Sequence, residues 1–294
     1  MPGSPLPPPA LPSPAQASGR PSLRRFLRHK GAVTGGVLLL VLMATAALAP
    51  ALAPYDPIAQ DQRASLRAPA PAHPLGTDVF GRDILSRVIW GGRQSLRVGF
   101  LAVAVGGAVG TLLGLLAGYF EGWTGTLILR LTDLLLALPG ILLALTIVAA
   151  TGPSLENLIV AVGISSTPAY VRIVNGAVLD VKTRAFIEAS RASGAADLRI
   201  IGRHVAPNIL APIIVLSTLG LGNALLVAAT LSFLGMGAQP PTPEWGAMLS
   251  QGREFIFGYW WIATFPGVAI LLAVIGANLL GEGMRDLLDP RLRV

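Results

Sequence analysis

The 294-residue sequence contains no cysteine, and only 13% of its residues are charged. The missing cysteine excludes a disulfide framework, a thiolate metal site and a cysteine nucleophile. A soluble domain has about a quarter of its residues charged, whereas 53% of this chain is hydrophobic and its mean hydropathy is +0.65. These values exclude a single water-soluble globule, and the apolar content excludes disorder through most of the chain.

Catalytic and metal-binding motifs are also missing. No phosphate-binding loop of the form G-x-x-x-x-G-K-[ST] occurs, and neither lysine, Lys30 or Lys182, follows a glycine. His29, His73 and His204 lie in separate segments without metal-ligand spacing, and no G-x-S-x-G nucleophile elbow occurs. We therefore expect no ATP hydrolysis by that route, no metal site and no cofactor in this chain. A membrane enzyme is the least favoured class.

Six long apolar stretches dominate the sequence. Each has about the 20 residues that a helix needs to cross a ~30 Å hydrocarbon core. The second contains Gly106, Gly107, Gly110 and Gly114, and small residues let membrane helices approach closely. The sequence predicts an all-α membrane protein with six packed transmembrane helices. The stretches are residues 32–53, 98–120, 134–152, 156–176, 209–234 and 262–281.

The first stretch has a second interpretation. A basic run, an apolar core and Ala47-Leu48-Ala49 resemble a signal peptide with its cleavage site. The apolar run continues through Ala53, which favours a membrane helix. The predicted organisation is a disordered proline-rich and basic tail (1–30), a first transmembrane helix with an extracytoplasmic loop (31–93), a core of five transmembrane helices (94–283) and a C-terminal tail (284–294).

Basic residues indicate the orientation in the membrane. With the N-terminus inside, fourteen of the 22 lysines and arginines fall in inside segments and seven in outside segments. Because cytoplasmic loops are enriched in basic residues, both termini are predicted to be cytoplasmic. The 54–97 loop, with six arginines outside, fits this rule poorly and is expected to lie partly along the membrane surface. The net charge of +7 is attributed to topology, and we expect no nucleic-acid partner.

Ionisable residues are scarce within the apolar stretches. Asp133, Arg172 and Glu282 all lie near their ends. A carrier driven by protons or ions usually places acidic groups near mid-membrane. This distribution disfavours a stand-alone channel or secondary carrier, which stays the alternative of another class. The distribution fits a transport pathway that is opened by energy supplied outside the apolar stretches.

Residues 184–208, RAFIEASRASGAADLRIIGRHVAPN, form the most informative inside segment. Glu188 and the alanines that follow predict a short helix with one small-residue face. Gly194 is expected to interrupt it, and Pro207 to end helical hydrogen bonding before the fifth stretch. Two interpretations stay open at this point. The segment is either an amphipathic helix on the headgroups or a docking helix for a soluble partner.

The same segment resembles the cytoplasmic EAA motif of ABC importer permeases. That motif reads Glu-Ala-Ala, three residues, Gly, nine residues and Ile-x-Leu-Pro. Here Glu188-Ala189-Ser190 is followed by Gly194 at the same spacing, and His204-Val205-Ala206-Pro207 begins after nine more residues. The His-x-x-Pro-Asn ending is similar to the peptide and nickel branch of these permeases.

Other segments resemble the same branch, in the same order along the chain. The resemblance covers about residues 73–294 and, less tightly, the first stretch, and it is to the C-type subunit of the permease pair. One departure is Gly125, where the branch often has Asp after Gly-x-Trp. The similar segments are 73–78, 81–83, 85–87, 93–99, Arg130 to Asp133 with Pro139, 231–235, 243–246 and 289–293.

This resemblance implies a type I ABC importer permease fold with a cytoplasmic coupling helix at 188–200, in the inner (plasma) membrane of a bacterium. It implies four partners besides the lipid bilayer: a second permease in a heterodimer, two ATP-binding subunits that hold ATP and Mg²⁺, and an extracytoplasmic substrate-binding protein. Glu188 would pair with the ATPase subunit, and Gly194 would allow the turn. The residues implied to couple are Glu188, Ala189, Ser190, Gly194, Ala195, Asp197, Arg199, His204 and Pro207.

The implied cargo is dipeptides or oligopeptides, with nickel, haem or glutathione as alternatives. No residue is assigned to cargo binding. The 54–97 and 236–260 loops are expected on the binding-protein side. Within them, Arg82 and Asp83 are predicted to form a surface ion pair worth under about 1 kcal/mol. Trp260 and Trp261 are predicted to anchor the chain at the membrane interface.

Overall fold

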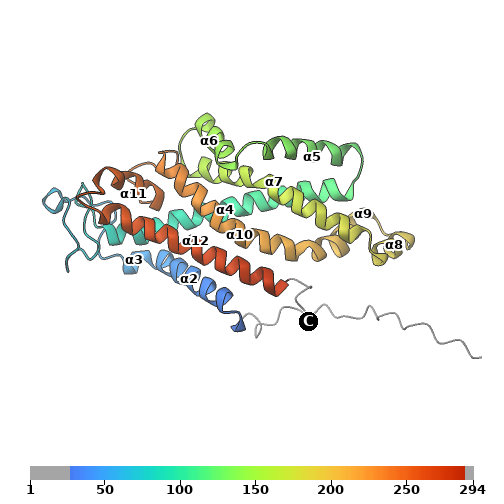
Figure 1. Ribbon diagram of the computed structural model, residues 1–294, viewed down its shortest axis with the longest axis horizontal. Coiled ribbons are helices and arrows are strands. Elements are labelled where there is room, and N and C mark those ends of the chain that lie inside the picture. Colours follow the sequence, from blue (N-terminus) through green and yellow to red (C-terminus); the bar gives the residue numbers. More distant parts are fainter. Residues whose placement is uncertain (1–26, 289–294) are drawn as a thin grey trace, which may run out of the picture.

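The structure, a computed structural model, describes residues 27–288, and helices dominate this part of the chain (Figure 1). Two isolated β-bridges occur in the loop before the second long helix. The helices are α2 (Lys30–Ala47), α3 (Ala49–Leu52), α4 (Ile84–Tyr119), α5 (Trp123–Leu136), α6 (Gly140–Thr151), α7 (Leu155–Lys182), α8 (Ala185–Ala192), α9 (Asp197–Ile200), the π-helical turn η2 (Ile201–Val205), α10 (Ala206–Phe233), α11 (Trp245–Gly252) and α12 (Trp261–Leu288), with short 3-10 turns η1 (Gln62–Ala64) and η3 (Arg253–Phe255).

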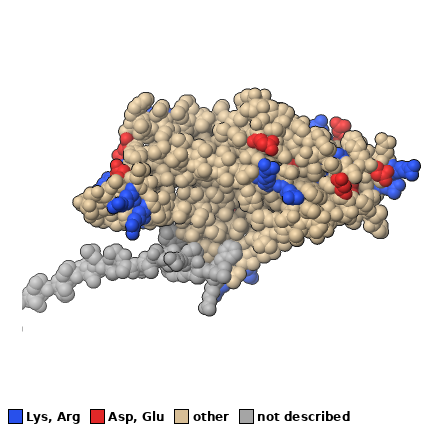
Figure 2. Space-filling view, turned by 180° about the vertical axis from the view of Figure 1, so that it is seen from behind, with Lys and Arg blue, Asp and Glu red and all other residues tan. Residues whose placement is uncertain are grey.

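Five helices in the described chain are long and apolar enough to cross a membrane: α2, α4, α7, the run of α9, η2 and α10, and α12. They lie lengthwise in an elongated bundle (Figure 1). We call the end that holds α8 and α9 the coupling end, and the end that holds residues 54–83 and α11 the loop end. Figure 2 shows a face that carries few charged side chains apart from a small central group and clusters toward the two ends.

The predicted third stretch, a continuous helix over 134–152, is wrong. The chain forms α5 and α6 there, bent by 92° at the break between them. Pro139 is the N-cap residue of α6, and its carbonyl accepts hydrogen bonds from N–H groups in the first turn of that helix. The residue before a proline is disfavoured in helical geometry, so α5 ends before Pro139. Asp133 therefore lies in the last turns of α5, where it pairs with Arg172 of α7 at 2.6 Å. Six spans result when α5 and α6 together count as one.

A row of glycines holds α4 against α7. The four glycines are spaced four residues apart, so they share one face of the helix. A Cβ added at any of them would lie between 2.7 and 3.1 Å from a backbone oxygen of α7. Such approach is possible only without side chains, and it confirms the close packing predicted from small residues. The residues are Gly106, Gly110, Gly114 and Gly118.

The first span belongs to the bundle through α12. A Cβ on Gly35 would lie 2.6 Å from Gly276 O, so the two backbones touch. At the coupling end, the His29 ring lies 3.0 Å from the Asp286 carboxylate. The start of α2 and the end of α12 therefore lie at the same end of the bundle, as Figure 1 also shows.

Two predicted boundaries fall inside helices. The boundary at residue 93 lies within α4, because the Asp83 carboxylate caps this helix by accepting from Ser86 N at 2.8 Å and the helix begins at Ile84. The tail predicted from 284 begins too early, because α12 continues to Leu288. The proline-rich tail up to residue 26 and the 289–293 segment lie outside the described residues.

Candidate coupling site

The predicted interruption at Gly194 is confirmed, and it is a helix-ending turn. Gly194 has φ +76°, its N–H donates to Arg191 O at 2.9 Å, and Ala195 N–H donates to Ser190 O at 3.2 Å. This pair of bonds is a Schellman motif, which satisfies the last carbonyls of α8. The coupling element predicted over 188–200 is therefore two short helices, α8 and α9, joined by a tight turn, and α8 starts at Ala185.

The inner side of this hairpin is packed on the bundle. Ile187 of α8 and Ile200 of α9 are fully buried. They join one apolar cluster with residues of α4, α7 and α10. Because fully burying such a side chain is worth about 1.5–3 kcal/mol, the hairpin is fixed to the ends of the spans. The cluster consists of Tyr119, Val174, Val178, Val181, Ile187, Ile200, Val205 and Ile209.

The outer side of the hairpin is exposed. Leu198 is 82% exposed, and Phe186 is 41% exposed with its ring 6.1 Å from that of His204. Two large apolar side chains are therefore accessible on this side of the hairpin. None of the ion pairs within residues 27–288 includes Glu188. Of the predicted coupling residues, Ser190, Ala195 and His204 are half-buried, and Glu188, Ala189, Gly194, Asp197, Arg199 and Pro207 are exposed.

Tyr119, at the end of α4, anchors the hairpin. Its hydroxyl donates to the Asp197 carboxylate at 2.6 Å. Lys182 donates to Tyr119 O at 2.8 Å and to the Glu121 carboxylate at 3.0 Å. Arg191 lies 5.6 Å from the Tyr119 ring, and its pKa is raised, first by hydrogen bonding to the Tyr119 hydroxyl. This anchor could not be predicted from the sequence, because residues far apart along the chain build it.

Pro207 does not end helical hydrogen bonding, contrary to the prediction. Because Pro207 has no N–H, the preceding turn widens, and Ala206 N–H donates five residues back to Ile201 O. The result is the π-helical turn η2, which joins α9 to α10 without a break. The hairpin therefore continues directly into a span of the bundle.

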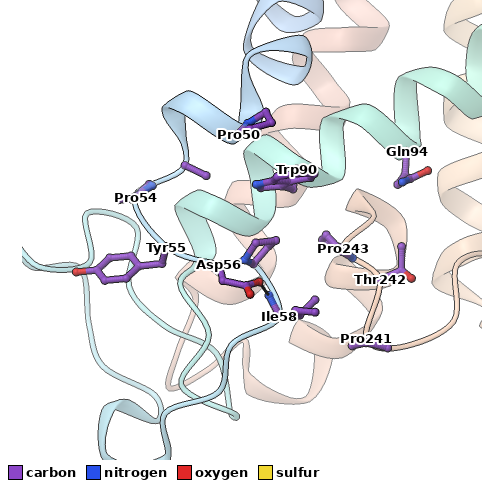
Figure 3. Close-up of a pocket in the computed structure, with 12 residues that line it drawn as sticks. Pro50, Pro54, Tyr55, Asp56, Ile58, Trp90, Gln94, Pro241, Thr242 and Pro243 are labelled. Carbon is purple, nitrogen blue, oxygen red and sulfur yellow. Dashed lines mark hydrogen bonds between the residues drawn. The ribbon is translucent and has the colours of Figure 1, made fainter.

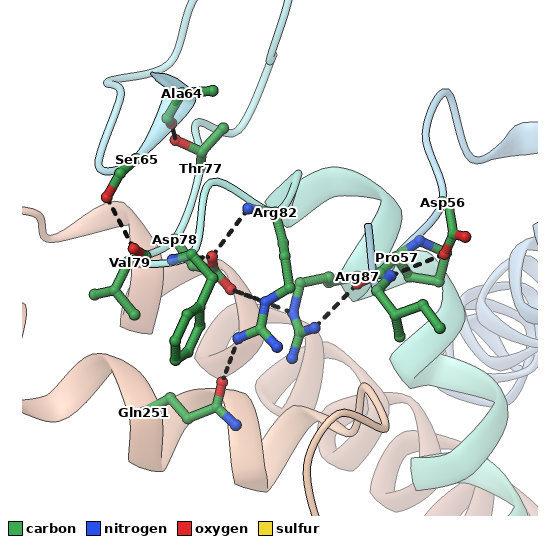
Figure 4. A network of polar contacts seen from close by, with 12 residues as sticks. Asp56, Pro57, Ala64, Ser65, Thr77, Asp78, Val79, Arg82, Arg87 and Gln251 are labelled. Atoms are coloured by element: carbon green, nitrogen blue, oxygen red, sulfur yellow. Dashed lines mark hydrogen bonds and ion pairs between the residues drawn. The ribbon is translucent and has the colours of Figure 1, made fainter. Parts of the chain in front are cut away.

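The loop end is organised by buried charges (Figure 4). Arg82 Nε donates to the Asp78 carboxylate at 2.6 Å, and Arg87 Nε lies 3.7 Å from the same group. Arg87, only 1% exposed, also donates to Pro57 O at 3.0 Å, and Arg82 reaches Gln251 at 3.1 Å. The predicted surface pair of Arg82 with its neighbour in sequence is therefore wrong: the arginine is buried and has a different partner.

The neighbouring Asp83 is buried too, and it has its own partners. It accepts from His73 at 3.0 Å and from both the N–H and the hydroxyl of Ser86. Trp261, at the start of α12, is only 6% exposed and donates to Thr77 O at 3.2 Å. It is therefore a core residue and not the predicted interfacial anchor, whereas Trp260 is half exposed.

A pocket of about 700 Å³ opens at the loop end (Figure 3). Its walls are formed by prolines from α3, from the segment that follows α3 and from the loop before α11, together with Tyr55 and Trp90. Gln94 lines it as well, and its side-chain oxygen is buried without a hydrogen-bond partner among residues 27–288. Within residues 27–288, no three His, Asp or Glu side chains are grouped to hold a metal ion.

A five-span bundle with a broken pair and an exposed hairpin at one end is the fold of a type I ABC importer permease. The chain is similar to a subunit of the MetNI methionine ABC transporter, solved in inward-facing conformations, with a TM-score of 0.58 and 18% identity. The likeness covers 69% of this chain and 96% of that one.

The family follows from sequence comparison. Residues 110–294 match the binding-protein-dependent transport system inner membrane component, and residues 19–69 match the N-terminal transmembrane domain of oligopeptide transport permease C. The chain belongs to this family of ABC importer transmembrane subunits. It is a multi-pass membrane protein, and its role is that of a permease subunit.

Several relatives match almost end to end. The dipeptide permease DppC of Haemophilus influenzae is 45% identical over 91% of this chain and 93% of that protein. The di/tripeptide permease DppC of Pseudomonas aeruginosa is 47% identical over 91% and 90%. The glutathione permease GsiD of Pectobacterium atrosepticum is 47% identical over 92% and 90%.

Proposed function

We propose that this chain forms half of the pathway through which a bacterial ABC importer takes up dipeptides or short oligopeptides. The observation that carries the proposal is identity of 45–47%, over about nine-tenths of both chains, with permeases named for dipeptides and tripeptides. The other half of the pathway is a second permease. Two ATP-binding subunits hold ATP and Mg²⁺ and hydrolyse ATP, and an extracytoplasmic binding protein delivers the cargo.

In this proposal the hairpin of α8 and α9 docks on an ATP-binding subunit. Its exposed Leu198 and Phe186 supply apolar contact, and Glu188 supplies a charge for a basic partner. The buried Ile187 and Ile200 support the proposal, because a docked element must be fixed to the spans to move them. Closure of the ATPases on ATP then shifts the hairpin and the helices to which it is attached.

The proposed orientation places the coupling end in the cytoplasm of the cell. Both described chain ends lie there, joined through His29 and Asp286. Under this orientation fourteen lysines and arginines fall in inside segments, tails included, against seven in outside segments. The loop end then faces the binding protein. Its buried pair of Arg82 and Asp78 holds that surface in one conformation.

Glutathione is the second candidate cargo. The 47% identity with a glutathione permease favours it, and glutathione is itself a tripeptide, so both candidates share peptide chemistry. Nickel and haem have a different chemistry and serve as test alternatives.

The test measures ATP hydrolysis by the complex assembled from this chain and its co-encoded partners. Loaded binding protein is added with a dipeptide, a longer peptide, glutathione, nickel or haem. Stimulation by peptide is expected. Stimulation by nickel or haem alone would contradict the proposed cargo, and the absence of any co-purifying ATPase would contradict the proposed assembly.

Two variants test the hairpin. Glu188→Lys and Gly194→Trp are expected to abolish stimulation, because they place a reversed charge and a large ring on the docking face. Matched controls make the same changes outside the hairpin and outside the loops assigned to the binding protein. They are Glu282→Lys, at an exposed position on α12, and Gly152→Trp, which has φ +92° and where a Cβ meets no atom of the described residues within 4 Å. Equal stimulation in all four variants would overturn the docking assignment.

A further inference from the structure

A cavity of about 500 Å³ lies between α4, α6, α7 and α10. Asn223 lines it ten residues before the end of α10, and Ser165 lines it ten residues after the start of α7. The end of α10 and the start of α7 both lie toward the loop end. Each side chain is therefore about 15 Å along its helix from that end. Both positions fall in the middle third of their 28-residue helices, which are long enough to span a ~30 Å hydrocarbon core. The volume falls in the ~300–1,000 Å³ range of small-molecule sites.

The polar lining of this cavity is neutral. The Asn223 amide is exposed, and none of the side-chain hydrogen bonds within residues 27–288 satisfies it. The hydroxyls of Ser165 and Ser166 donate to carbonyls of their own helix, which leaves their oxygens free to accept. Tyr170 donates to Ser217 at 3.2 Å beside them. In the described part of the chain, no charged residue lines the cavity.

An exposed amide at this depth needs an explanation. In contact with lipid, an unpaired amide costs several kcal/mol, whereas beside a water-filled pathway the cost disappears. The broken span adds backbone donors at the same depth: Gly140 and Ile141 line the cavity at the start of α6, where the first N–H groups have no intrahelical partner.

We propose that this cavity is a transient binding station for the peptide backbone of the cargo, halfway along the pathway, with Asn223 as its main hydrogen-bonding group. The proposal rests on the proposed import of peptides. Peptide bonds carry one donor and one acceptor each, which amide and hydroxyl side chains match in any peptide sequence. Neutral groups also bind weakly enough to release the cargo onward.

The missing cysteines make a direct test possible, because the parent chain gives no thiol background. Asn223→Cys and Ser165→Cys are introduced separately, and each complex is treated in membranes with a membrane-impermeant thiosulfonate reagent. The matched controls are Leu226→Cys and Ile164→Cys, which are exposed positions on the same helices outside the cavity. An apolar environment raises a thiol pKa, so the controls are expected to react about tenfold more slowly. Dipeptide with its binding protein and ATP is expected to slow the reaction of the cavity cysteines only.

A second arm measures uptake of labelled dipeptide. Asn223→Leu is expected to lower the uptake rate about fivefold, the effect of one lost hydrogen bond, and Asn223→Gln is expected to restore most of it. Leu226→Ala is the control and should transport normally.

The outcomes separate the two proposals. If the complex imports peptide but all four cysteines react at the same rate, lipid or partner side chains fill the cavity and the binding station is wrong. If peptide never stimulates ATP hydrolysis in the parent complex, the proposed cargo is wrong instead. In that case, fast reaction at the two cavity positions still assigns the cavity to an aqueous pathway but removes its peptide role.

Discussion

Replacing Gly110 with alanine is expected to destabilise the packing of α4 against α7, while the same change at Gly107 is not. A Cβ on Gly110 would overlap Tyr170 and lie 2.7 Å from Thr167 O, so the two backbones must move apart. A Cβ on Gly107 would lie 3.4 Å from the Tyr170 ring, near ordinary contact distance. Overpacking of this kind costs about 1–3 kcal/mol.

The helix preference of alanine works in the opposite direction at both sites. Alanine is favoured over glycine by about 1 kcal/mol inside a helix. The expected difference between the two variants is therefore the packing cost alone, about 1–3 kcal/mol in favour of Gly107→Ala.

The assay is thermal unfolding of the purified complex, monitored for this subunit, with both variants prepared identically. At about 2–4 °C per kcal/mol for a chain of this size class, Gly110→Ala should unfold several degrees below Gly107→Ala. Gly176→Ala provides a second control, because its Cβ meets no atom within 4 Å. Equal unfolding temperatures for all three variants would refute the claim that the backbones of α4 and α7 touch.

Three further outcomes are expected. Asp78→Asn leaves Arg82 and Arg87 buried without a counter-charge and should lower the free energy of unfolding by about 3–5 kcal/mol. The expected readout is loss of folded protein in membranes. A normal yield and a normal unfolding temperature would contradict the buried network. Gly194→Ala places a side chain at φ +76° and should cost about 1–2 kcal/mol of stability, which lowers cargo-stimulated ATPase activity. Gly194→Asn should lower this activity less, because asparagine tolerates the conformation. Lower activity in Gly194→Asn than in Gly194→Ala would contradict the turn. Tyr119→Phe removes the bond to α9 and should cost about 0.5–1.5 kcal/mol, measured as faster proteolysis of the hairpin; an unchanged rate would rule out the anchor.

The spans were predictable because length and apolar content decide whether a helix crosses a membrane. The break in the third span was not, because a proline alone does not decide it. Pro168, Pro212 and Pro266 all lie inside helices of this chain. Even the Pro-Gly pair does not decide it, because Pro139-Gly140 stands at the break whereas Pro266-Gly267 stands inside α12.

The candidate site and the loop end were also only partly predictable from the sequence. The turn at Gly194 was predictable, because glycine at a helix end is a local signal. The partner of Arg82 was not, because it depends on how the chain turns at Gly81, which has φ +72°. That turn brings Asp78 to the arginine and leaves Asp83 to cap α4. Neighbours in sequence were therefore a poor guide to charge pairing here.

The unbroken α4 has a mechanical consequence. Its 36 residues make a rod of about 54 Å, capped by Asp83 at one end and ending in Tyr119, which holds the hairpin, at the other. An α-helix with no proline inside it transmits an axial push without an intermediate joint. A push on the hairpin therefore reaches the loop end through one stiff helix, and a push at the loop end reaches the hairpin in the same way.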